Sequence, residues 1–112
     1  MKLFVLAFCF LLPASGLELK PGVPIYLAAG ESEPVRRAVK DLQRDLKTVL
    51  GADSAVIDKL NSGPAIVILG PASGLQKLRH PAVKERESHA VFARGPQVVL
   101  QGADTRGTIY AI

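Results

Sequence analysis

The chain has 112 residues, a formal net charge of +4 and no tryptophan, and aromatic residues make up only 5% of it. This composition argues against a free-standing carbohydrate-binding module or a binder of single-stranded nucleic acid, because both usually present exposed aromatic side chains. The only cysteine is Cys9. It lies in an apolar stretch that we expect to be removed, so no disulfide and no thiolate ligand is expected in the mature protein.

The first 16 residues have the pattern of a secretory signal peptide. Lys2 supplies a positive start, residues 3–12 carry no charge, and Ala14-Ser15-Gly16 places small residues before the expected cleavage site. Ten apolar residues are too few to span a bilayer, which takes about 20. We therefore expect residues 17–112 to form the mature chain, secreted or periplasmic, with no membrane attachment after cleavage.

The first structural elements are a short strand over 24–28 and a long amphipathic helix over 33–50. Ser32 is the expected helix cap, and Gly51 the residue that ends the helix. On the polar face, Arg37 and Asp41 have the spacing of an ion pair. The apolar positions recur at helical spacing and form one stripe, which consists of Val35, Ala38, Val39, Leu42, Leu46, Val49 and Leu50.

The second half of the chain alternates apolar runs with turns. The run at 65–69 is continuous and β-branched, as expected for a strand covered on both faces. The other expected elements are a strand at 55–57, a polar and basic connection at 75–88, strands at 90–93 and 98–100 joined by a tight hairpin, and a helix that starts near 105. Together they predict a two-layer α/β domain over 17–112. In it, a mixed sheet of about five strands packs on the long helix, and the second helix is truncated at the C-terminus.

Several residue pairs invite a catalytic or metal-binding interpretation, and each has a simpler one. Asp41 and Asp45 share a helix face, but cations surround them, so we interpret this face as a solvated surface. His80 and His89 have no acidic cluster at metal-ligand spacing. We expect no metal, no cofactor and no catalytic residue in this chain. The basic stretch 77–86 lacks interleaved aromatics, so we interpret it as a solvated loop and expect no nucleic-acid partner.

The segment from Gly102 to Gly107 has the glycine spacing of a phosphate loop between a strand and a helix. That chemistry needs a lysine directly after the second glycine, and here the position holds Thr108. A structural interpretation is favoured: Asp104 or Thr105 caps the helix, and Gly107 lets it pack closely on the sheet. Binding of a sugar carboxylate at this helix N-terminus stays open as an alternative.

Three segments together resemble one family. They are 39–51, 65–70 and the stretch that runs from 87–92 through 102–112, and their order and spacing are similar to the N-terminal domain of the xylan alpha-glucuronidases of glycoside hydrolase family 115. The run from Arg106 to Tyr110 is the most specific part. The first segment alone also resembles the helix ahead of the barrel in family 67 glucuronidases and beta-hexosaminidases.

The resemblance implies an α/β accessory domain ahead of a (β/α)8 barrel that removes glucuronic acid, often 4-O-methylated, from xylan. The barrel would carry the catalytic acids, so this chain alone is expected to be inactive. The implied partners are the missing barrel of the same polypeptide and, through it, glucuronoxylan. The alternatives are a small secreted carbohydrate- or protein-binding domain, or the matching domain of a family 67 glucuronidase or beta-hexosaminidase. The residues that match the motif leading into the barrel are Asp104, Arg106, Gly107, Thr108 and Tyr110.

Overall fold

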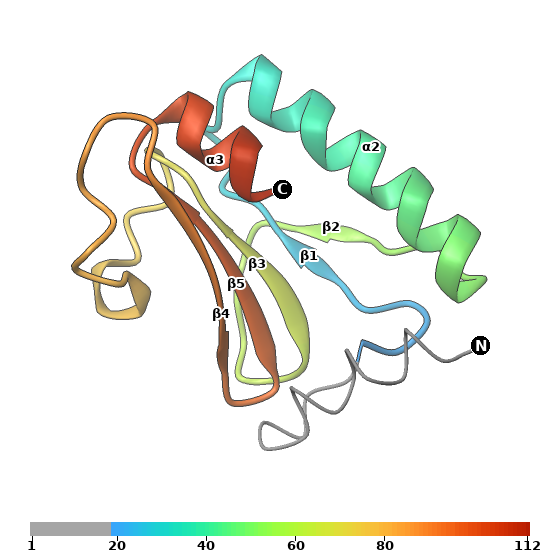
Figure 1. Ribbon diagram of the computed structural model, residues 1–112. Helices are drawn as coiled ribbons and strands as arrows, with labels where there is room; N and C mark the ends of the chain where they lie inside the picture. Colours follow the sequence, from blue (N-terminus) through green and yellow to red (C-terminus); the bar gives the residue numbers. More distant parts are fainter. Residues whose placement is uncertain (1–18) are drawn as a thin grey trace, which may run out of the picture.

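The computed structural model describes residues 19–112, and the expected signal peptide 1–16 lies outside them. The described chain folds into a five-stranded sheet with the order β2-β1-β3-β5-β4, in which only β4 is antiparallel to its neighbour (Figure 1). This confirms the expected mixed sheet. The elements are β1 (Ile25–Tyr26), α2 (Glu33–Leu50), β2 (Val56–Ile57), β3 (Ala65–Leu69), the short 3-10 helix η2 (Gln76–Leu78), β4 (His89–Arg94), β5 (Gln97–Gly102) and α3 (Thr105–Ala111).

Helix α2 has the expected bounds, but its N-terminal cap and one of its ion pairs differ from the prediction. Gly51 ends it with φ 85°, and its N–H donates to the carbonyl of Lys47 at 2.9 Å. Ser32 is the N-cap residue, but its side chain makes no capping hydrogen bond. Arg37 pairs with Glu33 at 3.6 Å rather than with Asp41, which pairs with Arg44. Helical side chains lean toward the N-terminus, so Arg37 reaches the acid of the preceding turn.

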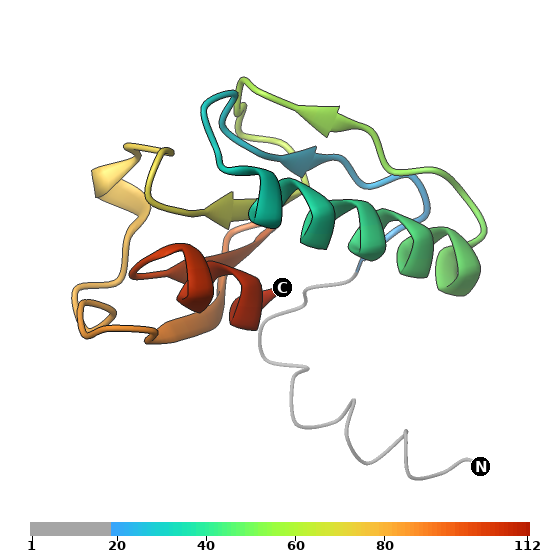
Figure 2. The ribbon, with the colours of Figure 1, turned by 90° about the horizontal axis from the view of Figure 1, so that it is seen from above.

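One face of the sheet is covered by α2 and α3, which lie side by side (Figure 2). Alternate residues of β3 point to opposite faces: Ile66 and Ile68 lie under the helices, while Val67 and Leu69 face the other side. All five residues of β3 are buried, which confirms that this strand is covered on both faces. The helix-side core consists of Val23, Ile25, Leu27, Val35, Val39, Leu46, Ile66, Ile68, Leu100 and Ala111.

The second face of the sheet is covered by loops and by η2. Leu60, Leu75, Leu78 and Phe92 pack there against a smaller buried cluster that includes Val67. The expectation of a purely solvated loop over 77–86 was therefore wrong in part, because Leu78 lies within that stretch and packs against the sheet. Lys77, Lys84, Glu85 and Arg86 of the same stretch are exposed as expected, but Arg79 is half-buried and its guanidinium donates to the Gly70 carbonyl and to the Ser73 hydroxyl.

Two buried glutamines of β5 fasten these loops to the sheet. Gln97 is 6% exposed, and its Nε2 donates to the carbonyls of Asn61 at 2.8 Å and Gly63 at 2.9 Å. Gln101 is 1% exposed. Its Oε1 accepts from the N–H of His80 at 2.7 Å, and its Nε2 donates to the carbonyl of His80 at 3.2 Å. Buried amides thus satisfy backbone groups of loops that belong to no sheet or helix ladder.

We predict that Gln101→Met lowers the free energy of unfolding by about 1–3 kcal/mol, because methionine keeps the volume but leaves the His80 backbone groups without partners. Urea unfolding followed by circular dichroism measures the change. Gln76→Met, at an exposed glutamine of η2, is the matched control and should stay within about 0.5 kcal/mol of the parent chain. Equal unfolding midpoints for the two variants would contradict this role of Gln101.

Candidate functional site

The motif residues identified from the sequence lie at the junction of β5 and α3, and most of their hydrogen bonds are made by Asp104. Asp104 is the N-cap of α3, and its Oδ1 accepts from the N–H of Gly107 at 2.8 Å. Its carbonyl accepts from the N–H of Thr108 at 2.9 Å and from the Thr108 hydroxyl at 2.7 Å. Of the two cap candidates, Asp104 rather than Thr105 takes the role, since a carboxylate oxygen satisfies an otherwise unpaired helix N–H.

The second carboxylate oxygen of Asp104 reaches the connection that enters β4. Oδ2 accepts from the N–H of Glu87 at 2.9 Å, and the adjacent Ala103 N–H donates to the carbonyl of Ser88 at 3.0 Å. Glu87 has φ 61°, a left-handed conformation that is costly for a residue with a side chain. Its carboxylate also pairs with Arg106 at 3.2 Å. These contacts hold Glu87 in that conformation and join two segments 17 residues apart.

The environment of Asp104 keeps its carboxylate ionised. Hydrogen bonds from the backbone N–H groups of Gly107 and then Glu87 lower its pKa below the ordinary value of 3.8, and the nearby charges of Arg86 and Arg106 act in the same direction. A general acid needs the opposite change, a raised pKa. Asp104 is therefore suited to holding chain segments together rather than to donating a proton.

Two glycines allow the chain segments at this junction to approach closely. A Cβ at Gly102 would collide with the backbone of Thr108, and a Cβ at Gly107 would collide with the carbonyl of Ser88. The expectation that Gly107 lets α3 pack on the sheet is thus corrected: Gly102 makes that approach possible, whereas Gly107 makes room for the connection into β4. Of the helix N–H groups that could attract an anion, that of Gly107 already binds Asp104.

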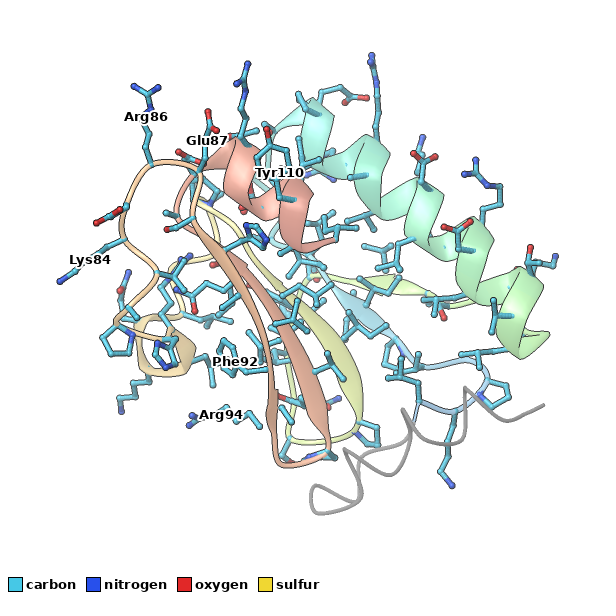
Figure 3. All side chains as sticks on the ribbon, in the orientation of Figure 1. Lys84, Arg86, Glu87, Phe92, Arg94 and Tyr110 are labelled. Atoms are coloured by element: carbon cyan, nitrogen blue, oxygen red, sulfur yellow. The ribbon has the colours of Figure 1, made fainter. Side chains whose placement is uncertain are left out.

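The remaining motif residues lie on the outer side of α3. Arg106 is exposed and reaches Glu87, as described above. Tyr110 is 55% exposed (Figure 3). Its ring lies edge-on to that of His89, with 6.0 Å between the ring centroids. The structure thus places all five motif residues on α3 or at its cap. Three of them, Asp104, Gly107 and Thr108, form the hydrogen-bonded centre. That the motif leads into a barrel stays a prediction.

The other residues considered from sequence lie apart from this junction or bind elsewhere. Asp41 and Asp45 are exposed and both pair with Arg44, at 3.3 Å and 3.8 Å. His80 contacts Phe92 and not His89. Within residues 19–112, no three His, Cys, Asp or Glu side chains lie close enough together to hold a metal ion. Over the same range, no helix has the length and apolar character that crossing a bilayer requires.

Sequence reasoning missed a buried carboxylate at the edge of the sheet where β1 and β3 end. Glu31 is 6% exposed, and its Oε2 accepts from the N–H of Ala72 at 3.1 Å. A Cβ at Gly70 would overlap the Glu31 carboxylate, so the carboxylate occupies the space that a side chain at this position would take. Arg36 donates to the carbonyls of Glu31 and Ala29. The only sequence signal was the glycine after a buried strand, which does not identify its partner.

We predict that Gly107→Ala destabilises the protein by about 1–3 kcal/mol, because the added methyl group must displace the Ser88 carbonyl. Gly30→Ala is the matched control, since a Cβ there would meet only the Ala72 methyl at an ordinary 3.9 Å. Thermal unfolding of both variants measures the difference. If both variants have the same melting temperature as the parent chain, the Ser88 carbonyl moves without cost, and the proposed close approach at Gly107 is contradicted.

The pKa of Asp104 predicts the pH dependence of stability. Because that pKa is lowered in the folded state, the contribution of Asp104 is fully present above 3.8 and is lost as the pH falls through the lower folded-state value. Asp104→Asn should therefore be less stable than the parent chain near neutral pH, and the gap should narrow in acid. Urea unfolding from about pH 7 to about pH 2 measures both curves. A gap that stays constant over this range would contradict the assignment.

No model of a protein family matches this sequence, and no curated protein matches it either. Among solved structures, the chain is similar to a glycoside hydrolase family 115 4-O-methyl-alpha-glucuronidase with specificity for decorated arabinogalactans, with a TM-score of 0.67 and 25% sequence identity. The match covers 83% of this chain but 13% of that one. The chain is thus related in structure to a domain-sized part of a glycoside hydrolase.

Proposed function

We propose that the chain is the N-terminal, non-catalytic α/β domain of a secreted glycoside hydrolase that removes glucuronic acid from xylan or a related polysaccharide. The similarity to part of an alpha-glucuronidase, over 83% of this chain, is the observation that carries the proposal. The run from Arg106 to Tyr110 supports it independently, because it resembles the same family in sequence. The catalytic (β/α)8 barrel would be the remainder of the parent polypeptide.

The environment of the acidic residues supports a non-catalytic role. Hydrolysis of a glycosidic bond uses two carboxyl groups that flank the bond, about 5–9.5 Å apart, and one of them has a raised pKa. Asp104 has a lowered pKa and binds backbone N–H groups through both oxygens. Asp41 and Asp45 pair with one exposed arginine. Glu31 is buried beneath the turn at Ala72.

One exposed surface fits contact with another domain. Val91 is 60% exposed and Tyr110 is 55% exposed, on β4 and α3 respectively. Val91 points away from the face where Phe92 packs, as His89 does, so both lie on the side of β4 that meets α3. The two elements that carry these side chains contact each other, and exposed apolar patches often mark an interaction site. We propose that the barrel of the parent enzyme covers this surface.

The signal-peptide pattern of residues 1–16 supports export, so we place the mature protein outside the cytoplasm, either secreted or periplasmic. The parent enzyme would meet glucuronoxylan there. Its polymer specificity is part of the proposal, because the similar solved enzyme is described as specific for decorated arabinogalactans.

The test compares this chain with the longer polypeptide that the proposal expects the gene to encode. We expect the longer protein to release 4-O-methylglucuronic acid from glucuronoxylan, and the 112-residue chain, after export, to release none. Chromatography of the released acids measures both. Release by the short chain would overturn the non-catalytic role, and a reading frame with no barrel or an inactive longer protein would overturn the glucuronidase assignment.

A further inference from the structure

An open groove of about 500 Å³ lies on the loop-covered face of the sheet, between η2 and the turn that joins β4 to β5. Its apolar lining includes Leu60, Leu75 and Leu78, and its polar lining includes Asn61, Ser62 and Arg94. The bonds from Gln97 to the carbonyls of Asn61 and Gly63 hold one wall in place. Apolar walls with a few polar groups are typical of sites for small ligands or polymer segments.

Arg94 supplies the cation of this groove. It is the last residue of β4, is exposed, and lies on the same strand face as Phe92, which packs toward the loops. Within residues 19–112, its guanidinium takes part in no ion pair and no hydrogen bond. A free guanidinium is suited to a planar carboxylate, which it can bind through two parallel hydrogen bonds.

Further cations without an ion pair lie on the connection before β4, at the end of β4 opposite to Arg94 (Figure 3). Lys84 and Arg86 are exposed, and Figure 3 shows them with Arg94 along one margin of the molecule, pointing away from the sheet. Lys77, on η2, is exposed as well. No ion pair within 19–112 involves any of these four cations, whereas Arg37, Arg44 and Lys47 of α2 all pair with acids.

The distribution of charge along the chain agrees with this contrast. Residues 71–112 hold six Lys and Arg against three Asp and Glu, a net charge of +3. Residues 19–70 hold seven against six, a net charge of +1. Residues 71–112 therefore carry more excess positive charge than residues 19–70, and such an excess raises the local concentration of anions.

We propose that the groove and the neighbouring cations Lys77, Lys84, Arg86 and Arg94, together called the cationic groove, bind a polysaccharide that carries uronic acid carboxylates. Arg94 pairs with one carboxylate at the leucine-lined groove, and the other cations meet carboxylates further along the polymer. A single exposed ion pair contributes little, so the site recognises a chain with several charges rather than a free sugar acid. The choice of polymer rests on the proposed function, but the surface itself does not.

Nucleic acid is the other polyanion to consider, and it fits less well. Sequence-independent binding of single strands uses aromatic side chains on which the bases stack. The groove is lined by leucines instead, and its neighbour Phe92 is half-buried against the sheet. The proposed binding of a polysaccharide therefore depends on pairs between carboxylates and cations, and not on stacking of sugar rings on aromatic side chains. Binding of nucleic acid is therefore the alternative that the test distinguishes from binding of an acidic polysaccharide.

The test is affinity electrophoresis and calorimetry of the exported full chain with glucuronoxylan. The comparison polymer is the same glucuronoxylan with its carboxyl groups reduced to alcohols. We expect the acidic polymer to bind at least about tenfold more tightly than the reduced one, and the difference to shrink in high salt. Arg94→Gln should weaken binding about two- to fivefold, and combining it with Lys84→Gln and Arg86→Gln should abolish the preference for the acidic polymer.

Lys40→Gln is the matched control, because Lys40 is an exposed cation of α2, on the opposite side of the sheet, and should leave binding unchanged. Arg94→Lys, which keeps the charge but not the fork of donors, should give an intermediate loss. Equal binding to both polymers, an equal effect of Lys40→Gln, or tighter binding to single-stranded DNA would overturn the inference. Activity of the longer protein is measured separately. If the longer protein releases glucuronic acid but glucuronoxylan does not bind at Arg94, only this inference is overturned. If glucuronoxylan binds there but the longer protein releases no glucuronic acid, only the proposed function is overturned.

Discussion

The fold depends on covering a sheet on both faces when only one face has helices. The parallel strands at the centre are apolar on both sides, so the face opposite α2 and α3 must also be closed. Loops do this here, and loops carry backbone polar groups that water would otherwise satisfy. Gln97 and Gln101 resolve the conflict from within β5, because each buried amide bonds two backbone groups of a covering loop.

The junction at Asp104 solves a related problem at the end of the same strand. The chain leaves β5, turns and starts α3, while the connection from η2 arrives beside it to start β4. One carboxylate serves both segments, through Gly107 on the helix and Glu87 on the connection. Gly102 leaves room for α3 beside the end of β5, and Gly107 leaves room for the connection that enters β4. β5 is therefore fastened at its side by the amides of Gln97 and Gln101 and at its end by the carboxylate of Asp104.

Much of the secondary structure was readable from the sequence. Helix α2 and strand β3 have the predicted bounds, and the hairpin strands extend beyond the predicted cores at both ends. β1 was predicted over 24–28 and pairs only over Ile25–Tyr26, because ladder bonding to β2 is confined to two residues. In the candidate site, the sequence left the cap of α3 open between Asp104 and Thr105, and the structure assigns it to Asp104. The bond from the Glu87 N–H to Asp104 did not follow from the sequence, since no local pattern predicts contact across 17 residues.

The glutamines were missed for a different reason. A polar residue at either end of an apolar run looks like the end of a strand, and Gln97 and Gln101 flank the run at 98–100 in that way. Their burial depends on loops whose paths no periodicity describes. The same limit applies to Arg37, whose choice between two acids on one helix depends on side-chain direction and not on spacing alone.

The side chains of Gln97 and Gln101 bind only main-chain atoms. These are the carbonyls of Asn61 and Gly63, and the amide and carbonyl of His80. Every amino acid offers the same carbonyl, and every one except proline the same amide, so the side chains of these loops can be exchanged over generations while the loops stay in place. Proteins with this architecture can therefore diverge far in sequence and keep the same fold. A chain that no family profile matches can thus still superpose on a distant enzyme over 83% of its length.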